Sequence, residues 1–276
     1  MAANSQWPKW WQWPNVLALD ASLVGVGWLI ALAQANGVQI GIAPAVVLGL
    51  SIWLVYIADR WLDVRKLPLA QLPTVRHQFI KRWAMPFFVL WLIILITDLF
   101  LAIRSLDRIQ ILSGLIVVFL ALIHTVLSQI QTRLSIPKEA RISLIYMAGV
   151  GTFLSNEPAL WPGILVPLGL FGLLCFINCS MIAAKEIEFD ATMGRQSIAN
   201  SSGLQIFQFQ IIALFVLFVG LFLPESLIET DGPVAGAAIG LTIIGIQEYN
   251  IKPELFRVLA DAILLVPWLF LFNVHA

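Results

Sequence analysis

Long apolar stretches recur along the whole chain, and they constrain the fold more than any other feature. A helix that crosses the hydrocarbon core of a bilayer needs about 20 predominantly apolar residues, and the sequence supplies stretches of that length repeatedly. Hydrophobic residues make up 60% of the chain and charged residues only 12%, whereas soluble domains are about 25% charged. The sequence therefore predicts an all-α integral membrane protein.

The apolar stretches predict a single domain, residues 1–276, with nine transmembrane helices. Residues 1–14 contain four tryptophans and two prolines, and we expect them to lie at the membrane interface, where tryptophan is enriched. Polar and turn-forming residues separate the stretches. The expected helices cover residues 15–35, 42–63, 84–104, 109–130, 140–156, 163–185, 203–223, 232–248 and 254–273.

The basic residues are distributed unevenly over the expected loops. Fourteen of the 16 Lys and Arg residues fall on the side of the N-terminus, and only Arg104 and Arg108 fall on the other side. Because basic loops stay in the cytoplasm, we expect the N-terminus inside and the C-terminus outside. Basic and acidic residues cancel overall, so the net charge does not indicate nucleic-acid binding.

Two pairs of carboxylates lie at helix ends that this topology places on the cytoplasmic side. Asp59 and Asp63 end the second expected helix, and Glu186 and Asp190 follow the sixth with the same spacing. Residues four apart lie above one another on a helix, so each pair presents its carboxylates together. Like charges at this spacing repel unless a cation lies between them. We therefore expect both pairs to face one cavity; ordinary charge pairing at the membrane surface is the alternative.

Mg²⁺ is the cation that suits this arrangement. It binds one or two carboxylates, retains water and completes its coordination with phosphate oxygens. The expected substrate is therefore a diphosphate, whose departure the metal assists by neutralising negative charge. Four residues are expected to be both the metal ligands and the catalytic residues: Asp59, Asp63, Glu186 and Asp190.

At these pairs the chain resembles the UbiA superfamily of intramembrane prenyltransferases. The segment VYIADRWLD, from Val55 to Asp63, is similar to the family motif NxxxDxxxD, with Val55 at the place of the Asn. The segment EFDATMGRQSIA, from Glu188 to Ala199, looks like the second acidic motif and the turn after it. The resemblance implies a nine-helix bundle that binds a polyprenyl diphosphate and Mg²⁺ at its cytoplasmic face.

The resemblance also implies basic residues that hold the diphosphate. Family members carry a YPxxKR-like segment after the fourth helix, and RLSIPKEAR is similar to it through Lys138 and Arg141. The loop PTVRHQFIKRW is either a lid over the diphosphate or an anchor on anionic headgroups. Three cations beside the acidic pairs are further candidates for phosphate contacts: Arg65, Lys66 and Arg195.

Two polar side chains near the acidic pairs are candidates for the substrate pocket. Asn178 precedes Glu186 by two turns, where it either lines the pocket or makes a hydrogen bond between helices. Tyr56 is next to the first pair, and its ring could contact the prenyl chain or a carbocation. A structural hydrogen bond is the simpler role for three others inside expected spans: Asp20, His124 and Asp261.

The predicted function is that of an Mg²⁺-dependent membrane prenyltransferase. It would ionise a polyprenyl diphosphate and transfer the prenyl group to a small aromatic or lipid acceptor. The first alternative is a UbiA-type terpene cyclase, in which the prenyl chain attacks itself. The second alternative is a non-catalytic transporter or scaffold. Transporter sites usually lie near the bilayer midplane at broken helices, whereas these acidic pairs are expected at a membrane surface.

Overall fold

The computed structural model describes residues 7–65, 67–72, 74–129, 136–154, 161–192, 197–199, 203–222 and 228–273. Every regular element in these ranges is a helix, as the sequence predicts. The long helices are α2 (Leu19–Ala35), α3 (Ile42–Asp63), α5 (Ala84–Ser105), α6 (Arg108–Gln129), α7 (Lys138–Thr152), α8 (Trp161–Lys185), α11 (Ile206–Leu221), α12 (Ile228–Ile246) and α13 (Pro253–Ile263). The short ones include α1 (Trp13–Val16), α4 (Val75–Arg82), α9 (Ile187–Thr192) and α14 (Pro267–Asn273).

Each stretch that we expected to be helical contains a helix, but the first and last are interrupted. Residues 15–35 are divided between α1 and α2, and residues 254–273 between α13 and α14. By length and composition, four helices of the described chain can cross a membrane, or five if α1 and α2 form one bent span. The structure therefore supports an integral membrane protein, and the full count of nine spans remains a prediction.

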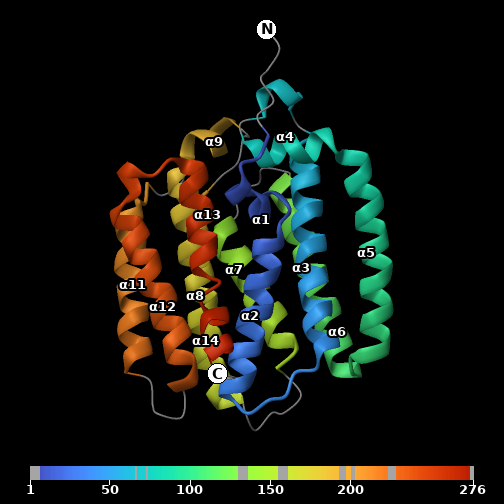
Figure 1. Ribbon diagram of the computed structural model, residues 1–276, viewed down its shortest axis with the longest axis vertical. Coiled ribbons are helices and arrows are strands. Elements are labelled where there is room, and N and C mark those ends of the chain that lie inside the picture. The colour runs from blue at the N-terminus through green and yellow to red at the C-terminus, as the bar shows by residue number, and fades with distance from the viewer. Residues whose placement is uncertain are drawn as a thin grey trace.

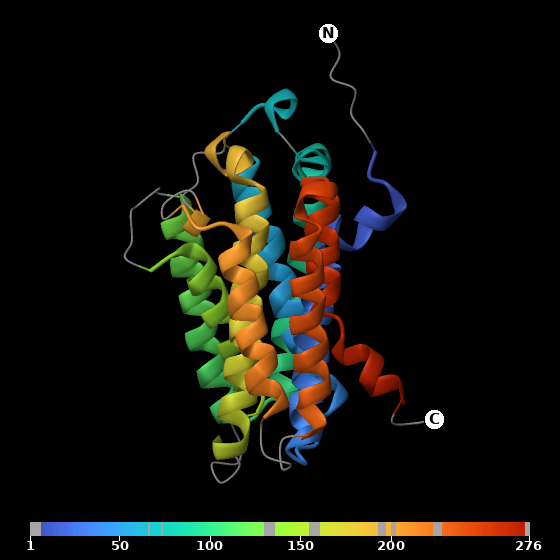
Figure 2. The same cartoon turned by 90° about the vertical axis from the view of Figure 1, so that its left-hand side faces the viewer.

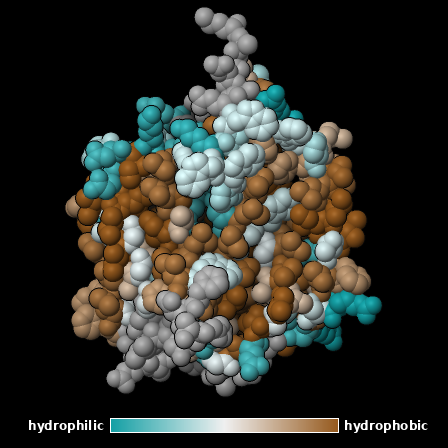
Figure 3. Space-filling model, in the orientation of Figure 1, coloured by the Kyte–Doolittle hydropathy of each residue, from teal (hydrophilic) through white to brown (hydrophobic). Residues whose placement is uncertain are grey.

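The helices stand side by side in one bundle, with α4 and α9 at the same end as the last turn of α3 (Figure 1). On the face shown in Figure 3, hydrophobic residues form a broad middle band and hydrophilic residues gather toward the two ends. Two helices, α5 and α6, expose nearly all of their apolar side chains on the outside of the bundle. Apolar side chains that face outward in this way suit contact with lipid.

A sharp bend separates α1 from α2. The two segments meet at 70°, and between them Ala18 has φ 57°, in the left-handed region that residues other than glycine rarely adopt. The bend interrupts the regular helical hydrogen bonding, although the Ala18 N–H still donates to the Asn15 carbonyl at 3.1 Å. Arg60 of α3 supplies replacements, because its Nη1 donates to the carbonyls of Asn15 at 2.5 Å and Val16 at 3.0 Å. Trp53 Nε1 donates to the next carbonyl along the chain at 2.8 Å.

The break between α13 and α14 is bridged in a similar way. Pro267 has no N–H group and cannot continue the hydrogen bonding of α13. Trp28 Nε1 of α2 donates to the carbonyl of Leu264 at 2.9 Å, and Trp268 Nε1 of α14 donates to the carbonyl of Leu23 at 2.9 Å. After the break, α14 turns away from the direction of the bundle (Figure 2). Both interrupted helices are therefore tied to their neighbours through satisfied carbonyls.

Candidate functional site

A cavity of about 610 Å³ lies inside the bundle. Its walls come from α1 to α9 and from α13, and one wall is a face of α3 that runs from Val47 to Asp63. At the rise of an α-helix this face is about 24 Å long. Most charged side chains gather toward the end near Asp63, whereas mainly aliphatic side chains of α3, α5, α6 and α7 line the rest, with Asp98 among them. The cavity thus combines a charged end with a long apolar part.

Both acidic pairs line this cavity, as we expected from their spacing. Asp59 and Asp63 occupy the last turns of α3. Glu186 lies between α8 and α9, and Asp190 belongs to α9. The Asp190 N–H donates to the Glu186 carbonyl at 2.8 Å. The two residues are therefore still one helical turn apart, although they lie where α8 gives way to α9. Helices far apart in the sequence therefore bring four carboxylates to one cavity.

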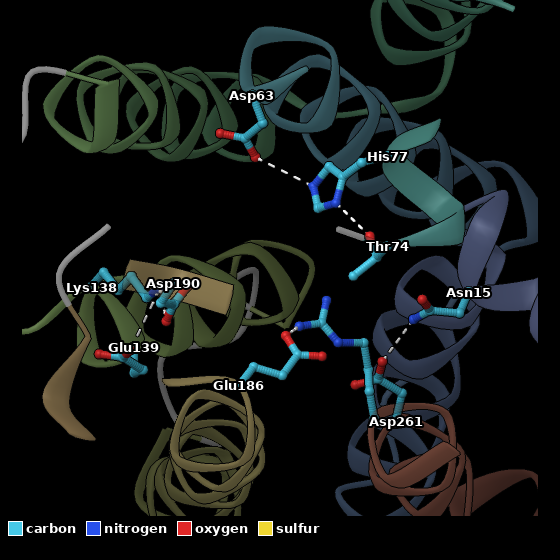
Figure 4. A network of polar contacts seen from close by, with 10 residues as sticks. Asn15, Asp63, Thr74, His77, Lys138, Glu139, Glu186, Asp190 and Asp261 are labelled. Carbon is cyan, nitrogen blue, oxygen red and sulfur yellow. Dashed lines mark hydrogen bonds and ion pairs between the residues drawn. The ribbon is translucent and has the colours of Figure 1, made fainter. Parts of the chain in front are cut away.

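Three of these carboxylates already have partners. Lys138 Nζ donates to Asp190 Oδ2 at 2.9 Å, and Arg257 forms an ion pair with Glu186. Asp63 Oδ1 accepts a hydrogen bond from Gln129 Nε2 at 3.3 Å. Figure 4 shows the Lys138 and Glu186 contacts in the same view. The second acidic pair is thus neutralised by two cations of the protein itself.

The histidine next to the first pair is neutral. His77 Nε2 of α4 lies 4.0 Å from Asp63 Oδ2, and its Nδ1 lies 2.6 Å from Thr74 Oγ1, as Figure 4 shows. Burial, followed by the charges of Arg76 and Arg60, lowers the pKa of His77 well below its usual value. The imidazole therefore interacts with Asp63 without a full positive charge at neutral pH.

The donor set suits Mg²⁺ by its chemistry. Four carboxylates at the charged end of a cavity are the hard oxygen ligands that this ion selects. Within the described ranges, however, no group of three or more His, Cys, Asp and Glu side chains is close enough to hold a metal ion. Lys138 and Arg257 occupy positions beside the carboxylates that a cation would otherwise neutralise. The predicted Mg²⁺ site therefore remains a proposal about Asp59, Asp63, Glu186 and Asp190.

The structure places the predicted basic residues in different surroundings. Lys138 lines the cavity. Arg141 lies outside the lining, and its buried Nε and Nη1 have no hydrogen-bond partner in the described part of the chain. Arg65 is exposed and stacks on Trp61, with its Cζ 3.8 Å from the ring centroid. Two further candidates lie outside the described residues: Lys66 and Arg195.

Two further arginines, Arg76 and Arg257, line the cavity. Arg76 belongs to the basic loop that we expected to be either a lid whose cations hold phosphate or an anchor on headgroups, whereas Arg257 was not predicted as a phosphate ligand. Arg76 interacts electrostatically with acidic groups of both cavity walls, among them Asp59, Asp190 and Asp261. Its buried Nε has no hydrogen-bond partner among the described residues. A guanidinium with an unused Nε donor can donate a charge-assisted hydrogen bond to an anion that binds beside it.

A second polar group, which we call the inner cluster, comprises Asn15, Asp20, Asn178 and Asp261. All four residues line the cavity. Asn15 Nδ2 donates to Asp20 Oδ2 at 2.7 Å and to Asp261 Oδ2 at 2.9 Å. Asn178 Nδ2 donates to Asp261 Oδ1 at 2.9 Å. The structural hydrogen bonds that we expected for Asp20 and Asp261 are therefore present, and Asn178 both bonds between helices and lines the cavity.

The remaining candidates lie along the same cavity. Tyr56 is part of the lining, and its ring is 6.4 Å from that of Tyr146 in an edge-to-face arrangement. His124 also lines the cavity, and its Nε2 is 3.4 Å from Ser128 Oγ. Asp98 of α5 was not predicted at all, although a lone Asp in 22 mostly apolar residues of one helix was a sequence signal.

Comparisons with family models, with curated proteins and with solved structures gave no match. The resemblance to the UbiA superfamily therefore remains a prediction from the sequence.

Proposed function

We propose that the protein is a membrane-embedded prenyltransferase that binds a polyprenyl diphosphate in the cavity and transfers the prenyl group to an acceptor. One observation carries the proposal: two acidic pairs from distant helices line the charged end of a cavity whose other part is long and apolar. A diphosphate with its counter-ions fits the charged end, and an isoprenoid tail fits the apolar part. UbiA-like architecture, with nine spans and the charged end toward the cytoplasm, belongs to the same proposal.

The protein's own cations would receive the diphosphate. Lys138 and Arg257 lie in the lining and are paired with Asp190 and Glu186, respectively, and the buried Nε of Arg76 has no hydrogen-bond partner among the described residues. Phosphate oxygens would replace the carboxylates as partners of these cations, which favours binding through charge-assisted hydrogen bonds. The released carboxylates, with those of the first pair, would hold Mg²⁺. When bound, the ion would supply positive charge that stabilises the leaving diphosphate.

A terpene cyclase is the second candidate, and aromatic side chains in the cavity lining favour it. Aliphatic side chains of several helices line the apolar part, and two tyrosine rings, those of Tyr56 and Tyr146, also line the cavity. Aromatic faces attract cations, so a carbocation formed from the prenyl chain would be stabilised inside. Both candidates begin with ionisation of the same diphosphate.

The first test is incubation of purified protein with Mg²⁺ and geranyl, farnesyl or geranylgeranyl diphosphate, with and without acceptors, followed by mass spectrometry. For a transferase we expect the diphosphate to remain intact until an acceptor is added; a hydrocarbon or terpene alcohol without acceptor would indicate the cyclase. Asp190→Asn should reduce turnover at least 100-fold, since it removes a charged group from the ionisation site.

Glu188→Gln provides the matched control for that variant. Glu188 lies on α9 with Asp190, but it is exposed and outside the cavity lining, so its loss should leave turnover unchanged. Intact diphosphate under every acceptor, together with unchanged diphosphate affinity in Asp190→Asn, would contradict the proposal and favour a scaffold or transporter.

A further inference from the structure

The inner cluster has an unused hydrogen-bond acceptor. Asn178 is only 4% exposed, and its Nδ2 must face Asp261 because a carboxylate accepts hydrogen bonds and cannot donate them. This orientation leaves Oδ1, which is buried and has no hydrogen-bond partner in the described part of the chain. A buried acceptor without a donor costs about 1–3 kcal/mol. A ligand with a donor group would remove that cost.

Tyr56 adds a hydroxyl group to the same region. Its side chain lines the cavity and interacts electrostatically with Asp20 and Asp261. A tyrosine hydroxyl can donate one hydrogen bond and accept others. The region therefore offers acceptors from Asn178 and the carboxylates, and a donor from Tyr56. A hydroxyl group of a ligand could donate a hydrogen bond to one of these acceptors and accept one from Tyr56.

The carboxylates of the inner cluster already have cationic neighbours. Asp20 and Asp261 interact electrostatically with two guanidinium groups, those of Arg60 and Arg76, and Arg76 also interacts with the acidic pairs. A ligand group with a net charge would enter a buried site, where an unpaired charge is expensive. A neutral polar group avoids that cost.

The inner cluster lies deeper than the acidic pairs. Asn178 precedes Glu186 by two turns of α8, or about 12 Å along the axis, and Tyr56 precedes Asp59 by about 4.5 Å on α3. If the diphosphate binds at the acidic pairs, its first prenyl carbon lies on the inner side of them, toward the cluster. A second substrate held by the cluster would be placed beside that carbon.

We infer that the inner cluster is the acceptor site of the enzyme, that it binds a neutral hydroxyl group, and that Asp261 receives the proton of that hydroxyl. The inference rests on the proposed prenyl transfer. In the reaction the bond between the first prenyl carbon and the diphosphate oxygen breaks, and diphosphate leaves with the electron pair. A lone pair of the acceptor oxygen forms the new carbon–oxygen bond, and the O–H proton passes to a carboxylate oxygen of Asp261. The product is a prenyl ether.

Binding of the hydroxyl can be measured without turnover. The thermal stability of detergent-solubilised protein is recorded with para-octylphenol or dodecanol and with the methyl ether of each. We expect one of the two hydroxyl compounds to stabilise the protein more than its methyl ether does. A difference in the phenol pair would indicate an aromatic acceptor, and a difference in the dodecanol pair an aliphatic alcohol. Asn178→Leu should abolish the difference, and Tyr56→Phe should reduce it. Equal stabilisation by hydroxyl compounds and ethers in the wild-type protein would overturn the inference.

Turnover tests the role of Asp261. The isosteric Asp261→Asn keeps the shape of the side chain and removes the proton acceptor. We expect kcat with the hydroxyl acceptor to fall by about 100-fold or more, the usual contribution of a general base, while the Kd for geranylgeranyl diphosphate stays within about twofold. Asn178→Leu should instead raise the acceptor KM by about tenfold, the effect of losing one hydrogen bond.

Glu254→Gln is the control on the same helix. Glu254 of α13 accepts a hydrogen bond from Gln12 at 2.8 Å and does not line the cavity, so kcat and KM should not change. Wild-type kcat in Asp261→Asn would overturn the role of Asp261. Failure of the wild-type protein to bind geranylgeranyl diphosphate would refute the proposed function instead, a separate result from loss of hydroxyl binding.

Discussion

Asp98 places an ionisable carboxylate in the middle of a helix whose other side chains mostly face outward. It is 7% exposed, and its Oδ2 accepts a hydrogen bond from Ser51 Oγ at 2.8 Å. Its buried Oδ1 has no partner among the described residues. Because Ser51 precedes Asp59 by two turns of α3, Asp98 lies about 12 Å inside the first acidic pair. An acidic group in the apolar part of a membrane cavity is expensive.

Replacing Asp98 by leucine should therefore raise the stability of the protein. The variant removes a buried acceptor without a partner, which is worth about 1 kcal/mol, and we expect a higher Tm in detergent. Ser51→Ala is the matched control, because it withdraws the remaining donor from Asp98 and should lower the Tm. A lower Tm for Asp98→Leu would show that the carboxylate stabilises the fold through contacts beyond Ser51.

Some of the individual residues of the site could be predicted from the sequence. The equal spacing of the acidic pairs was sufficient to place Asp59, Asp63, Glu186 and Asp190 around one cavity. The partners were not predictable, because Arg257 reaches Glu186 from a helix at the other end of the chain, and no local pattern encodes that contact. Arg65 was expected near phosphate from its sequence neighbours, but the structure stacks it on Trp61.

Small residues on α12 let the divided α13–α14 segment approach closely. A Cβ built on Gly236 would lie 2.9 Å from Val266 Cγ1, and one on Gly240 would lie 2.8 Å from Ile263 Cγ2. Both distances are shorter than van der Waals contact allows. Membrane helices use such residues to pack, because no hydrophobic effect drives them together in lipid. The position of α13, and with it Asp261, thus depends on these glycines.

Gly240→Leu should destabilise the protein by about 1–3 kcal/mol, the usual cost of overpacking. The Tm in detergent measures this effect. Gly169→Leu on α8 is the control, since a Cβ there would meet nothing within 4 Å, and we expect little change in Tm. If both variants lost the same stability, the cost would arise from glycine replacement in general and not from the contact between α12 and α13.

At this scale the sequence predicted where helices lie better than how they are interrupted. The second expected helix has the bounds of α3, Ile42–Asp63. The bend before α2 was not expected, because Ala18 is not a residue that favours the left-handed region. It becomes tolerable only when Arg60 and Trp53 satisfy the freed carbonyls, and those donors come from a different helix.

The orientation of the whole molecule in the membrane can be measured by cysteine labelling. The native cysteines are Cys175, which is buried, and Cys179, which is partly buried; both are first replaced by alanine. New cysteines are placed at Tyr249, which is 89% exposed, and at the exposed Arg108. An impermeant maleimide should label Tyr249→Cys only from the cytoplasmic side and Arg108→Cys only from outside, if the predicted topology is correct.

The two positions test the nine-span prediction together. Arg108 lies between the third and fourth expected spans, and Tyr249 between the eighth and ninth. Labelling of both from the same side would contradict the prediction, because it requires a different number of crossings between them. Both positions are exposed, so a lack of labelling means that the reagent is on the other side of the membrane and not that the cysteine is buried. The side from which Tyr249→Cys is labelled then shows which face of the membrane that end of the bundle meets.

The hydrogen bond from Asn15 to Asp261 connects residues 246 positions apart. During synthesis the chain leaves the ribosome from its N-terminus, so Asn15 is made long before its partner. The inner cluster can be completed only after α13 has entered the membrane, as one of the last events of biogenesis. A nascent chain that stalls before α13 would hold the acidic pairs but lack both Asp261 and Arg257, the ion-pair partner of Glu186.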